Sequence, residues 1–365
     1  MKGSKKGKDM YKKTKKGAGH NKKKRTARRY HGQYLLSFVL AWFVALFAYG
    51  IYATDPQIVS SVNYFIAQFG VLNFGNSQSE DILSDNRQKG DIQVMEVHYL
   101  DVGQGDATFL KCGGQTMLID AGEEDQGTAI QYYLMQQGIE KLDYLVLTHP
   151  DSDHIGSADV VITKFSIGHV MMSDYKKDSV SYRNLMQALE YMHLTPQYVQ
   201  AGETFTLGSA VCTILAPVGE YEDANNASVI LLVQNGANRF LFTGDAEEEA
   251  EEDILKYYSS GGILGMMSSD NALSQDAGGL LADTSLLRAD VYKVGHHGSS
   301  SSSTKAFLEA VSPKYAVISC GRNNEYGHPH EEILKRLQEH SAEIFRTDEQ
   351  GSIVAVSDGE NIYFK

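Results

Sequence analysis

The chain has little cysteine. Its 365 residues contain three, Cys112, Cys212 and Cys320, which cannot all pair within one chain and do not resemble the disulfide framework of a small secreted domain. Cys112 and Cys212 stand in apolar, strand-like stretches, where a cysteine is usually a small buried hydrophobic side chain rather than a metal ligand. We therefore expect no disulfide framework and no cysteine ligand at these two positions.

Basic residues are scarce after residue 30. The first 30 residues hold 14 of the 33 Lys and Arg, and Asp9 is their one acid. The rest of the chain has 33 − 14 = 19 basic and 46 − 1 = 45 acidic residues, a net charge of 19 − 45 = −26. A protein that tracks along DNA normally carries a basic groove. The composition after residue 30 argues against such a groove.

Long apolar runs are also scarce, and one run is a candidate membrane span. Tyr34–Ala53 is twenty residues without a charge, which makes a helix of about 30 Å. The alternative is a cleaved signal peptide, but its apolar core would be about 7 to 15 residues long, and Ile51-Tyr52-Ala53 matches a cleavage site poorly. We expect an uncleaved transmembrane helix over residues 33–53.

The basic arm, residues 1–32, predicts the orientation of this helix. By the positive-inside rule the arm stays in the cytoplasm, which places everything after Ala53 outside the cell. The arm could instead bind nucleic acid, although topology and anionic lipid headgroups explain it more simply. We therefore expect a single-pass protein of the cell membrane with a cytoplasmic N-terminus.

Beyond the helix, the composition indicates a linker and then one domain. Residues 54–91 form a juxtamembrane segment and linker, in which the uncharged residues 57–75 favour an interfacial helix over a loose packing segment. Residues 92–365 have the length of one large domain. Within it, residues 259–285 are rich in Ser, Gly, Ala and Asp, and we expect a mobile insertion there, with a substrate lid as the alternative.

Short strand patterns alternate with helical patterns through this domain, which favours an α/β fold. Two mixed sheets packed face to face with helices outside, a four-layer αβ/βα sandwich, suit this order. The predicted strands are 92–100, 107–111, 117–120, 144–149, 211–216, 228–233, 239–242, 290–294, 315–319, 343–346 and 352–356, and the predicted helices are 128–137, 181–192, 246–258, 304–310 and 330–340.

The most informative motif is His-Pro-Asp-Ser-Asp-His at residues 149–154, directly after the apolar run 144–148. It places four potential metal ligands on one loop at a strand end. Unpaired charges crowded into a partly buried cleft cost several kcal/mol, to an order of magnitude, unless a cation neutralises them. The motif therefore predicts a metal site made by His149, Asp151, Asp153 and His154.

Two later strands also end on potential ligands. Asp245 follows the apolar run 240–242, and His296 and His297 follow the run 291–294. Alone, such an aspartate is more often a turn former or a helix N-cap, and a histidine pair often lies on the surface. Together with the first loop they indicate one shared site.

The order of these residues, with Asp120 closing Met-Leu-Ile-Asp-Ala-Gly before the 149–154 loop, resembles the metallo-β-lactamase superfamily. Within it, Asp-Val-Gly-Gln-Gly-Asp at 101–106, Gly-His-His-Gly-Ser at 295–299 and the run 324–330 resemble the hydrolase domain of the DNA-internalisation competence (ComEC-like) family. The resemblance covers residues 92–362. The channel proteins of that family cross the membrane many times, whereas this chain has a single candidate span.

The resemblance implies two divalent metal ions about 3.5 to 4 Å apart, bridged by Asp245. His149 and Asp151 would complete the first site, and Asp153, His154 and His296 the second. A hydroxide shared by the metals would attack phosphorus. Asp151 stands where much of the superfamily has histidine, so its harder oxygen favours manganese or magnesium over zinc at the first site, and zinc enters the second more readily.

Other residues would serve catalysis or substrate binding. Asp153, His297 and His328 are the expected catalytic residues, the two histidines as candidates to protonate the leaving oxygen. Ser299 is the expected phosphate contact, and Asn226 is either a second one or a turn residue. We expect Asp106 and Asp120 to orient the metal ligands rather than to bind metal.

Three functions compete at this point. The first is a metal-dependent phosphodiesterase or nuclease that degrades DNA outside the cell, as the resemblance implies, with DNA-uptake machinery as a possible partner. The second is a cell-envelope hydrolase acting on teichoic-acid or phosphorylcholine esters. The third is a noncatalytic binding module, which the nearly complete ligand set argues against.

Overall fold

The computed structural model describes residues 92–260 and 284–365. The expected basic arm, transmembrane helix and linker, and most of the expected insertion at 259–285, lie outside these residues. The described residues belong to one compact unit. Among their helices, none is both long and apolar enough to cross a membrane.

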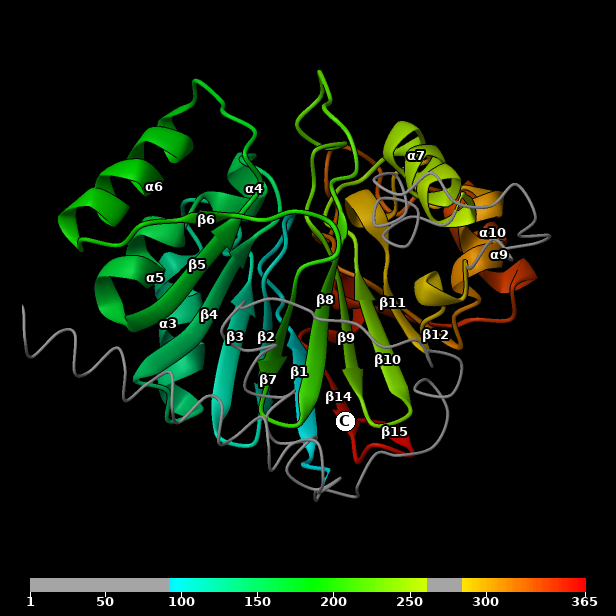
Figure 1. Ribbon diagram of the computed structural model, residues 1–365, viewed down its shortest axis with the longest axis horizontal. Coiled ribbons are helices and arrows are strands. Elements are labelled where there is room, and N and C mark those ends of the chain that lie inside the picture. The colour runs from blue at the N-terminus through cyan, green and yellow to red at the C-terminus, as the bar shows by residue number, and fades with distance from the viewer. Residues whose placement is uncertain (1–91, 261–283) are drawn as a thin grey trace, which may run out of the picture. The chain divides into compact units, whose positions relative to one another are not determined.

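Two mixed sheets form the centre of this unit (Figure 1). The first has eight strands in the order β15-β14-β1-β2-β3-β4-β5-β6, and the second has seven in the order β13-β12-β11-β10-β9-β8-β7. Side chains alternate across each strand, so one face of each sheet points toward the other sheet. Val97, Leu110, Ile214 and Phe240 belong to the buried cluster that these two faces form.

The strands of the first sheet are β1 (Met95–Tyr99), β2 (Thr108–Cys112), β3 (Gln115–Ile119), β4 (Lys141–Leu147), β5 (Ser166–Met172), β6 (Gln197–Tyr198), β14 (Ile353–Ser357) and β15 (Ile362–Phe364). Those of the second are β7 (Thr204–Leu207), β8 (Ala210–Ala216), β9 (Ile230–Asn235), β10 (Asn238–Phe242), β11 (Val291–Lys293), β12 (Tyr315–Ile318) and β13 (Glu343–Arg346).

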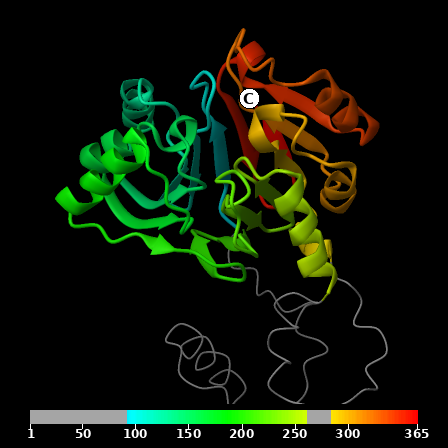
Figure 2. The same ribbon diagram turned by 90° about the horizontal axis from the view of Figure 1, so that it is seen from above.

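Helices cover the outer face of each sheet, as the view from above in Figure 2 shows. Apolar residues of three helices join the outer cluster of the first sheet, and those of three others join that of the second. The predicted four-layer α/β architecture is confirmed. The helices on the first sheet are α3 (Gly127–Gln136), α5 (Ala158–Lys164) and α6 (Val180–Tyr191), and those on the second are α7 (Glu248–Ser259), α9 (Lys305–Val311) and α10 (Glu331–Glu339); short turns complete the fold at α4 (Ser152–Ile155), η1 (Thr284–Leu287), η2 (Gly295–Gly298) and α11 (Thr347–Gln350).

Parallel pairing brings the predicted ligands to one edge. β3, β4 and β5 run parallel in the first sheet, and β10, β11 and β12 run parallel in the second. The carboxyl ends of parallel strands meet at one edge, where α/β proteins place their ligands. The two edges also touch each other, because the backbone N–H of Val229 donates to the carbonyl of Thr148 at 2.9 Å.

Gly244 allows this close approach. Its φ is +51°, a backbone conformation that is strained for any residue with a Cβ. A Cβ at this position would also lie 2.8 Å from the Cβ of Thr148. A larger residue would push the end of β10 away from the end of β4. Gly244 therefore sets the distance between the two halves of the site.

Candidate metal centre

Asp120 holds His154 in place. Asp120 follows β3 with a φ of 59°, and its carboxylate accepts hydrogen bonds from the backbone N–H and the hydroxyl of Thr148, at 2.8 and 2.7 Å. The Nδ1–H of His154 donates to the same carboxylate at 2.8 Å. This arrangement fixes the imidazole and leaves its Nε2 free to bind a metal. Asp120 thus has the orienting geometry that we expected.

The two histidines after β11 point their side chains in different directions. His296 and His297 both have left-handed backbones, with φ of 47° and 53°, which is uncommon for residues other than glycine. The Nδ1–H of His297 donates to the carbonyl of Ser319 at 3.0 Å, and its Nε2 lies 3.2 Å from Asp153 Oδ2. His297 therefore turns its Nε2 toward two carboxylates of the site, those of Asp153 and Asp245.

Four buried side chains come together at the contact between the sheets. Each of Asp106, His154, Asp245 and His297 offers one ligand atom, and these atoms all lie within 4.8 Å of one another. Two nitrogens and two carboxylate oxygens are ligands that zinc and manganese accept. Among the described residues, this group has the geometry of a metal site.

The hydrogen-bonding of this group is incomplete without a cation. His154 Nε2, His149 Nε2, Asp106 Oδ1 and Asp245 Oδ1 are buried atoms that have no hydrogen-bond partner in the structure. Buried polar atoms are rarely left unpaired, because each costs about 1 to 3 kcal/mol. Imidazole nitrogens and carboxylate oxygens are both ligands of divalent cations, so these residues fit a metal.

The charges lead to the same conclusion. His154 Nε2 lies 3.1 Å from Asp245 Oδ1, a repulsive contact unless a proton or a metal stands between them. Burial lowers the pKa of His154, but Asp245 and Asp120 outweigh burial and raise that pKa well above its usual value. Burial raises the pKa of Asp245, but His154 and His297 outweigh it and hold that pKa well below its usual value. Asp245 is thus anionic and attracts a cation.

The first-site residues, His149 and Asp151, lie beside this group. The ring of His149 is 4.1 Å from the ring of His154, centroid to centroid, and burial lowers its pKa, followed by the charge of His154. His149 is therefore neutral, the state that binds metal. Asp151 faces elsewhere: its Oδ1 accepts from Nζ of Lys177 at 2.7 Å.

His296 lies beside the four buried side chains and is itself 23% exposed. Its Nδ1 is 2.9 Å from Glu247 Oε1, and its Nε2 is 3.7 Å from Asp245 Oδ2. His297, whose Nε2 lies 3.5 Å from the same oxygen of Asp245, belongs to the group of four buried ligand atoms. The ligand role that we expected for His296 stays a prediction. Asp153, expected at the second site, contacts His297 and lies at the rim of the group.

His328 lies next to the histidine pair, with its ring 5.6 Å from that of His296, centroid to centroid. Its ring stacks 6.3 Å from that of His297, and its Nδ1 is 3.4 Å from Nε2 of Gln104. Because the Gln104 amide is a donor, Nδ1 of His328 accepts, and its proton is on Nε2. Burial and the nearby His297 and His296 lower the pKa of His328 to about 4, so it is neutral at pH 7.

The two expected substrate contacts differ in availability. The hydroxyl of Ser299 pairs with that of Ser301 at 2.9 Å, close to His296. The amide of Asn226 is used within the fold, because its oxygen accepts from the backbone N–H of Glu247 and its nitrogen donates to Glu249, at 3.1 Å each. Asn226 therefore stabilises the start of α7 in this structure.

Two lysines of the site were missing from the sequence-based prediction. Lys293 is 2% exposed and donates to Asp106 Oδ2 at 2.7 Å, and Lys177 pairs with Asp151. A lysine inside the apolar strand Val-Tyr-Lys-Val needs a buried anion, which was the available signal for Lys293. Asp106, expected as an orienting residue, lies among the four buried side chains and shares this charge with Lys293.

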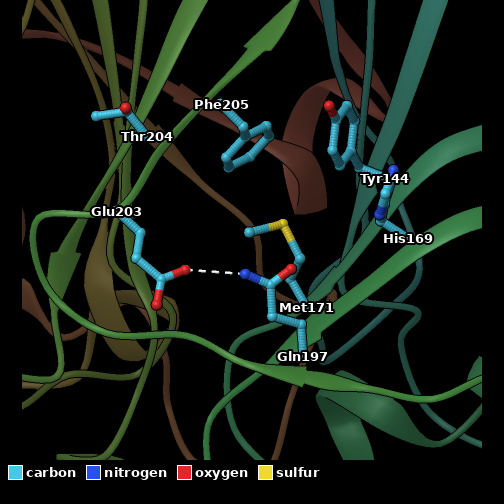
Figure 3. A pocket seen from close by; sticks show the side chains of 7 residues that line it. All are labelled: Tyr144, His169, Met171, Gln197, Glu203, Thr204 and Phe205. Atoms are coloured by element: carbon cyan, nitrogen blue, oxygen red, sulfur yellow. Dashed lines mark hydrogen bonds between the residues drawn. The ribbon is translucent and has the colours of Figure 1, made fainter. Parts of the chain in front are cut away.

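A separate hollow lies between the open edges of the sheets, away from these residues (Figure 3). Its volume is about 230 Å³, below the roughly 300 to 1,000 Å³ usual for ligand pockets. Gln197 donates to Glu203 at 2.9 Å and closes one end. No predicted ligand lines it; the lining residues are Tyr144, His169, Met171, Gln197, Glu203, Thr204 and Phe205.

The chain is similar to known proteins over the described domain. The model of the metallo-beta-lactamase superfamily matches residues 100–322. ComE operon protein 3 of Bacillus subtilis is 30% identical over 277 residues, 71% of this chain and 32% of that protein. Competence protein ComA of Neisseria gonorrhoeae is 30% identical over 254 residues, 69% of this chain and 31% of that protein. The chain thus spans about a third of the length of these relatives.

A solved structure with a similar arrangement is the metallo-beta-lactamase fold protein YhfI from Bacillus subtilis. It is 13% identical, with a TM-score of 0.45, and the match covers 73% of this chain and 100% of that chain.

Proposed function

Because this chain belongs to the metallo-beta-lactamase superfamily, we propose that it is a metal-dependent phosphodiesterase whose substrate is DNA. The observation that carries the proposal is the group of buried ligand atoms without partners at the contact between the two sheets. The name of one relative, Competence protein ComA, refers to competence, and that of another, Recombination protein 2 of Haemophilus influenzae, refers to recombination. These names support DNA as the substrate.

In this proposal His154, Asp245 and His297 hold a divalent cation together with Asp106 or Asp153, and His149 and Asp151 take part in a first site. A bound divalent cation supplies a hydroxide at neutral pH and offsets the charge that develops on the phosphoryl oxygens. The protein orients the ligands: Asp120 fixes His154, the Ser319 carbonyl fixes His297, and Lys293 neutralises Asp106.

His328 is the residue that we propose to meet the leaving oxygen. Its Nε2–H is the free donor of a neutral imidazole, since Gln104 occupies Nδ1. A neutral imidazole N–H can donate a hydrogen bond to developing negative charge at a phosphate oxygen. Removing it by His328→Ala should lower turnover by roughly 10²-fold, and by less for a good leaving group such as p-nitrophenolate.

We also propose that the chain is anchored in the cell membrane by residues 33–53, with the hydrolase domain outside the cell. The support is the uncharged run and the basic arm before it. Protease added to intact protoplasts should digest the hydrolase domain and leave a short basic fragment. Recovery of a soluble protein that begins near Thr54 would show cleavage instead.

One observation favours a second candidate, a hydrolase of cell-envelope phosphoesters. The net charge of −26 after residue 30 repels a long polyanion such as DNA, whereas a phosphorylcholine ester carries a quaternary ammonium that offsets its phosphate charge. This candidate uses the same metal centre and differs in the substrate alone.

The test compares substrates on the purified full chain. Single-stranded DNA, double-stranded DNA, bis-p-nitrophenyl phosphate and a phosphorylcholine ester are each incubated with manganese, magnesium or zinc. We expect metal-dependent cleavage of DNA and of the model diester, and its loss in Asp245→Ala. Hydrolysis of the phosphorylcholine ester without cleavage of DNA would transfer the proposal to the envelope hydrolase. Absence of hydrolysis with every metal would refute both.

A further inference from the structure

Asp151 has an unusual partner for its position. It begins the short turn α4, where an aspartate normally accepts a hydrogen bond from the first backbone N–H groups. Its side chain makes no such bond. Instead Oδ1 accepts from Nζ of Lys177 at 2.7 Å. The carboxylate that we expected at the first metal site is therefore held by an ammonium group.

The segment that carries Lys177 is fixed on both sides. Residues 173–179 connect β5 to α6, and the Tyr175 hydroxyl donates to the backbone carbonyl of Glu222 at 2.7 Å. Glu222 belongs to the connection between β8 and β9 of the other sheet, which rises at the same end of the molecule (Figure 1). On the other side, Ser179 accepts from the N–H of Tyr182 at 3.1 Å and caps α6. The ammonium is thus kept at the rim of the site.

The charge of Lys177 is accessible, unlike that of Lys293. The side chain of Lys177 is 40% exposed and that of Asp151 28% exposed, whereas Lys293 is 2% exposed and bound to Asp106. An anionic diester that enters the site meets the carboxylates of Asp153 and Glu247 at the rim. Lys177 is a cation that it can reach.

We propose that Lys177 binds a nonbridging oxygen of the substrate phosphodiester, and that it releases Asp151 to do so when a divalent cation binds at His149 and Asp151. The inference rests on the proposed function and names a residue that recognises the phosphate. An ammonium on a flexible four-carbon stem has three rotatable donors and can turn from a carboxylate to a phosphate. Lys177 and the first-site cation then compete for one carboxylate.

The competition predicts opposite effects of one substitution. In Lys177→Ala, the affinity for manganese at the weaker site should rise, because Asp151 is no longer paired. The KM for bis-p-nitrophenyl phosphate should increase about tenfold, since a hydrogen bond to a charged group is lost, with a smaller change in kcat. If Lys177 only oriented Asp151, the affinity for manganese should fall in Lys177→Ala, because removing an orienting partner weakens metal binding.

The experiment uses the full chain in four forms: wild type, Lys177→Ala, Lys177→Arg and the matched control Lys176→Ala. Lys176 is 70% exposed and lies 3.6 Å from Asp174, so its removal should change neither the affinity for manganese nor the KM. Calorimetry gives manganese affinity and stoichiometry, and the affinity for inorganic phosphate on manganese-loaded protein; kinetics give KM and kcat. Lys177→Arg should restore most of the phosphate affinity.

Two results would overturn the proposal: unchanged phosphate affinity in Lys177→Ala, or weaker manganese binding in that variant. Failure of the proposed function has a different signature. If wild type hydrolyses no diester with any metal, the phosphodiesterase assignment fails, while the calorimetric measurements of manganese and phosphate still decide the role of Lys177.

Discussion

The histidines of the metal centre share one pattern of ring nitrogens and differ in burial: His296 is 23% exposed, and His297 is 1% exposed. His154 and His297 each donate from Nδ1, to Asp120 and to the Ser319 carbonyl. A hydrogen bond at Nδ1 fixes the tautomer and leaves Nε2 to bind metal. His296 also has a paired Nδ1, 2.9 Å from Glu247, and its Nε2 lies 3.7 Å from Asp245 Oδ2, against 3.5 Å for Nε2 of His297. The backbone turn after β11, rather than the residue type, separates these two neighbours.

This difference gives a paired prediction. His297→Ala should lower the affinity for metal by at least about 10-fold, since even the loss of a group that only orients a ligand costs 10- to 100-fold. His296→Ala, as the matched control, should retain the metal. Elemental analysis after dialysis against buffered manganese measures both. Loss of metal in His296→Ala alone would restore His296 as the ligand.

Lys293 gives the second prediction at this scale. Lys293→Met leaves the buried carboxylate of Asp106 unpaired, so the free energy of unfolding of metal-free protein should fall by about 3 to 5 kcal/mol. If Asp106 also binds metal, manganese should stabilise Lys293→Met more than wild type, because the cation then replaces the lysine. Denaturant unfolding with chelator and with manganese measures the two increments. If manganese stabilised both proteins equally, Asp106 would not be a metal ligand and would only pair with Lys293.

Secondary-structure elements were predictable where the local pattern is strong. The helix expected at 181–192 is α6 (Val180–Tyr191), and the strand expected at 315–319 is β12 (Tyr315–Ile318). β7 (Thr204–Leu207) and β5 (Ser166–Met172) were missed. β7 is a short edge strand and the first half of β5 is largely exposed. Their stability comes from pairing with a neighbour, which a local pattern does not show.

One contact between α7 and the loop after η2 should depend on pH. Glu251 of α7 is buried, and its carboxylate accepts from the backbone N–H groups of Ser303 and Thr304 at 2.6 and 2.8 Å. Burial raises its pKa to about 7, although these hydrogen bonds oppose the change. In the unfolded chain the same group titrates near 4.5.

The sign of the prediction follows from these pKa values. Between pH 4.5 and 7 the folded protein keeps a proton that the unfolded chain has lost, so the stability contributed by Glu251 is complete below pH 4.5 and is lost as pH rises to 7. Glu251→Gln cannot titrate, and should remove this decline, while leaving one N–H unpaired at a cost of about 1 to 3 kcal/mol. Denaturant unfolding of both proteins at pH 5 and pH 7.5 tests this; parallel declines would contradict it.

At the scale of the whole molecule, the site exists only where two sheets meet. Asp106 and Lys293 are 187 residues apart in sequence, and Asp151 reaches a lysine on the connection after β5. The sequence identified most candidate ligands because they follow apolar strands. It could not identify these pairs, because they depend on tertiary geometry. The expectation that His296 binds metal and His297 is catalytic stays a prediction. The net charge of the chain after residue 30 is likewise a property at this scale.

That charge leads to a prediction about salt. A protein that neutralises six to ten DNA phosphates loses affinity steeply with salt, with a slope of log affinity against log salt of about −0.9 per phosphate on duplex DNA. The chain after residue 30 has a net charge of 19 − 45 = −26, so we expect the metal centre and Lys177 to make few phosphate contacts. The slope of log(1/KM) for DNA should be shallower than about −3, and Lys177→Ala should reduce it by about one. Steady-state kinetics at roughly 50 to 300 mM salt measure this slope. The control is bis-p-nitrophenyl phosphate, whose KM should depend little on the salt concentration. A slope steeper than about −6 would mean that a basic surface binds DNA, and the basic arm at residues 1–32 would then be the segment to delete next.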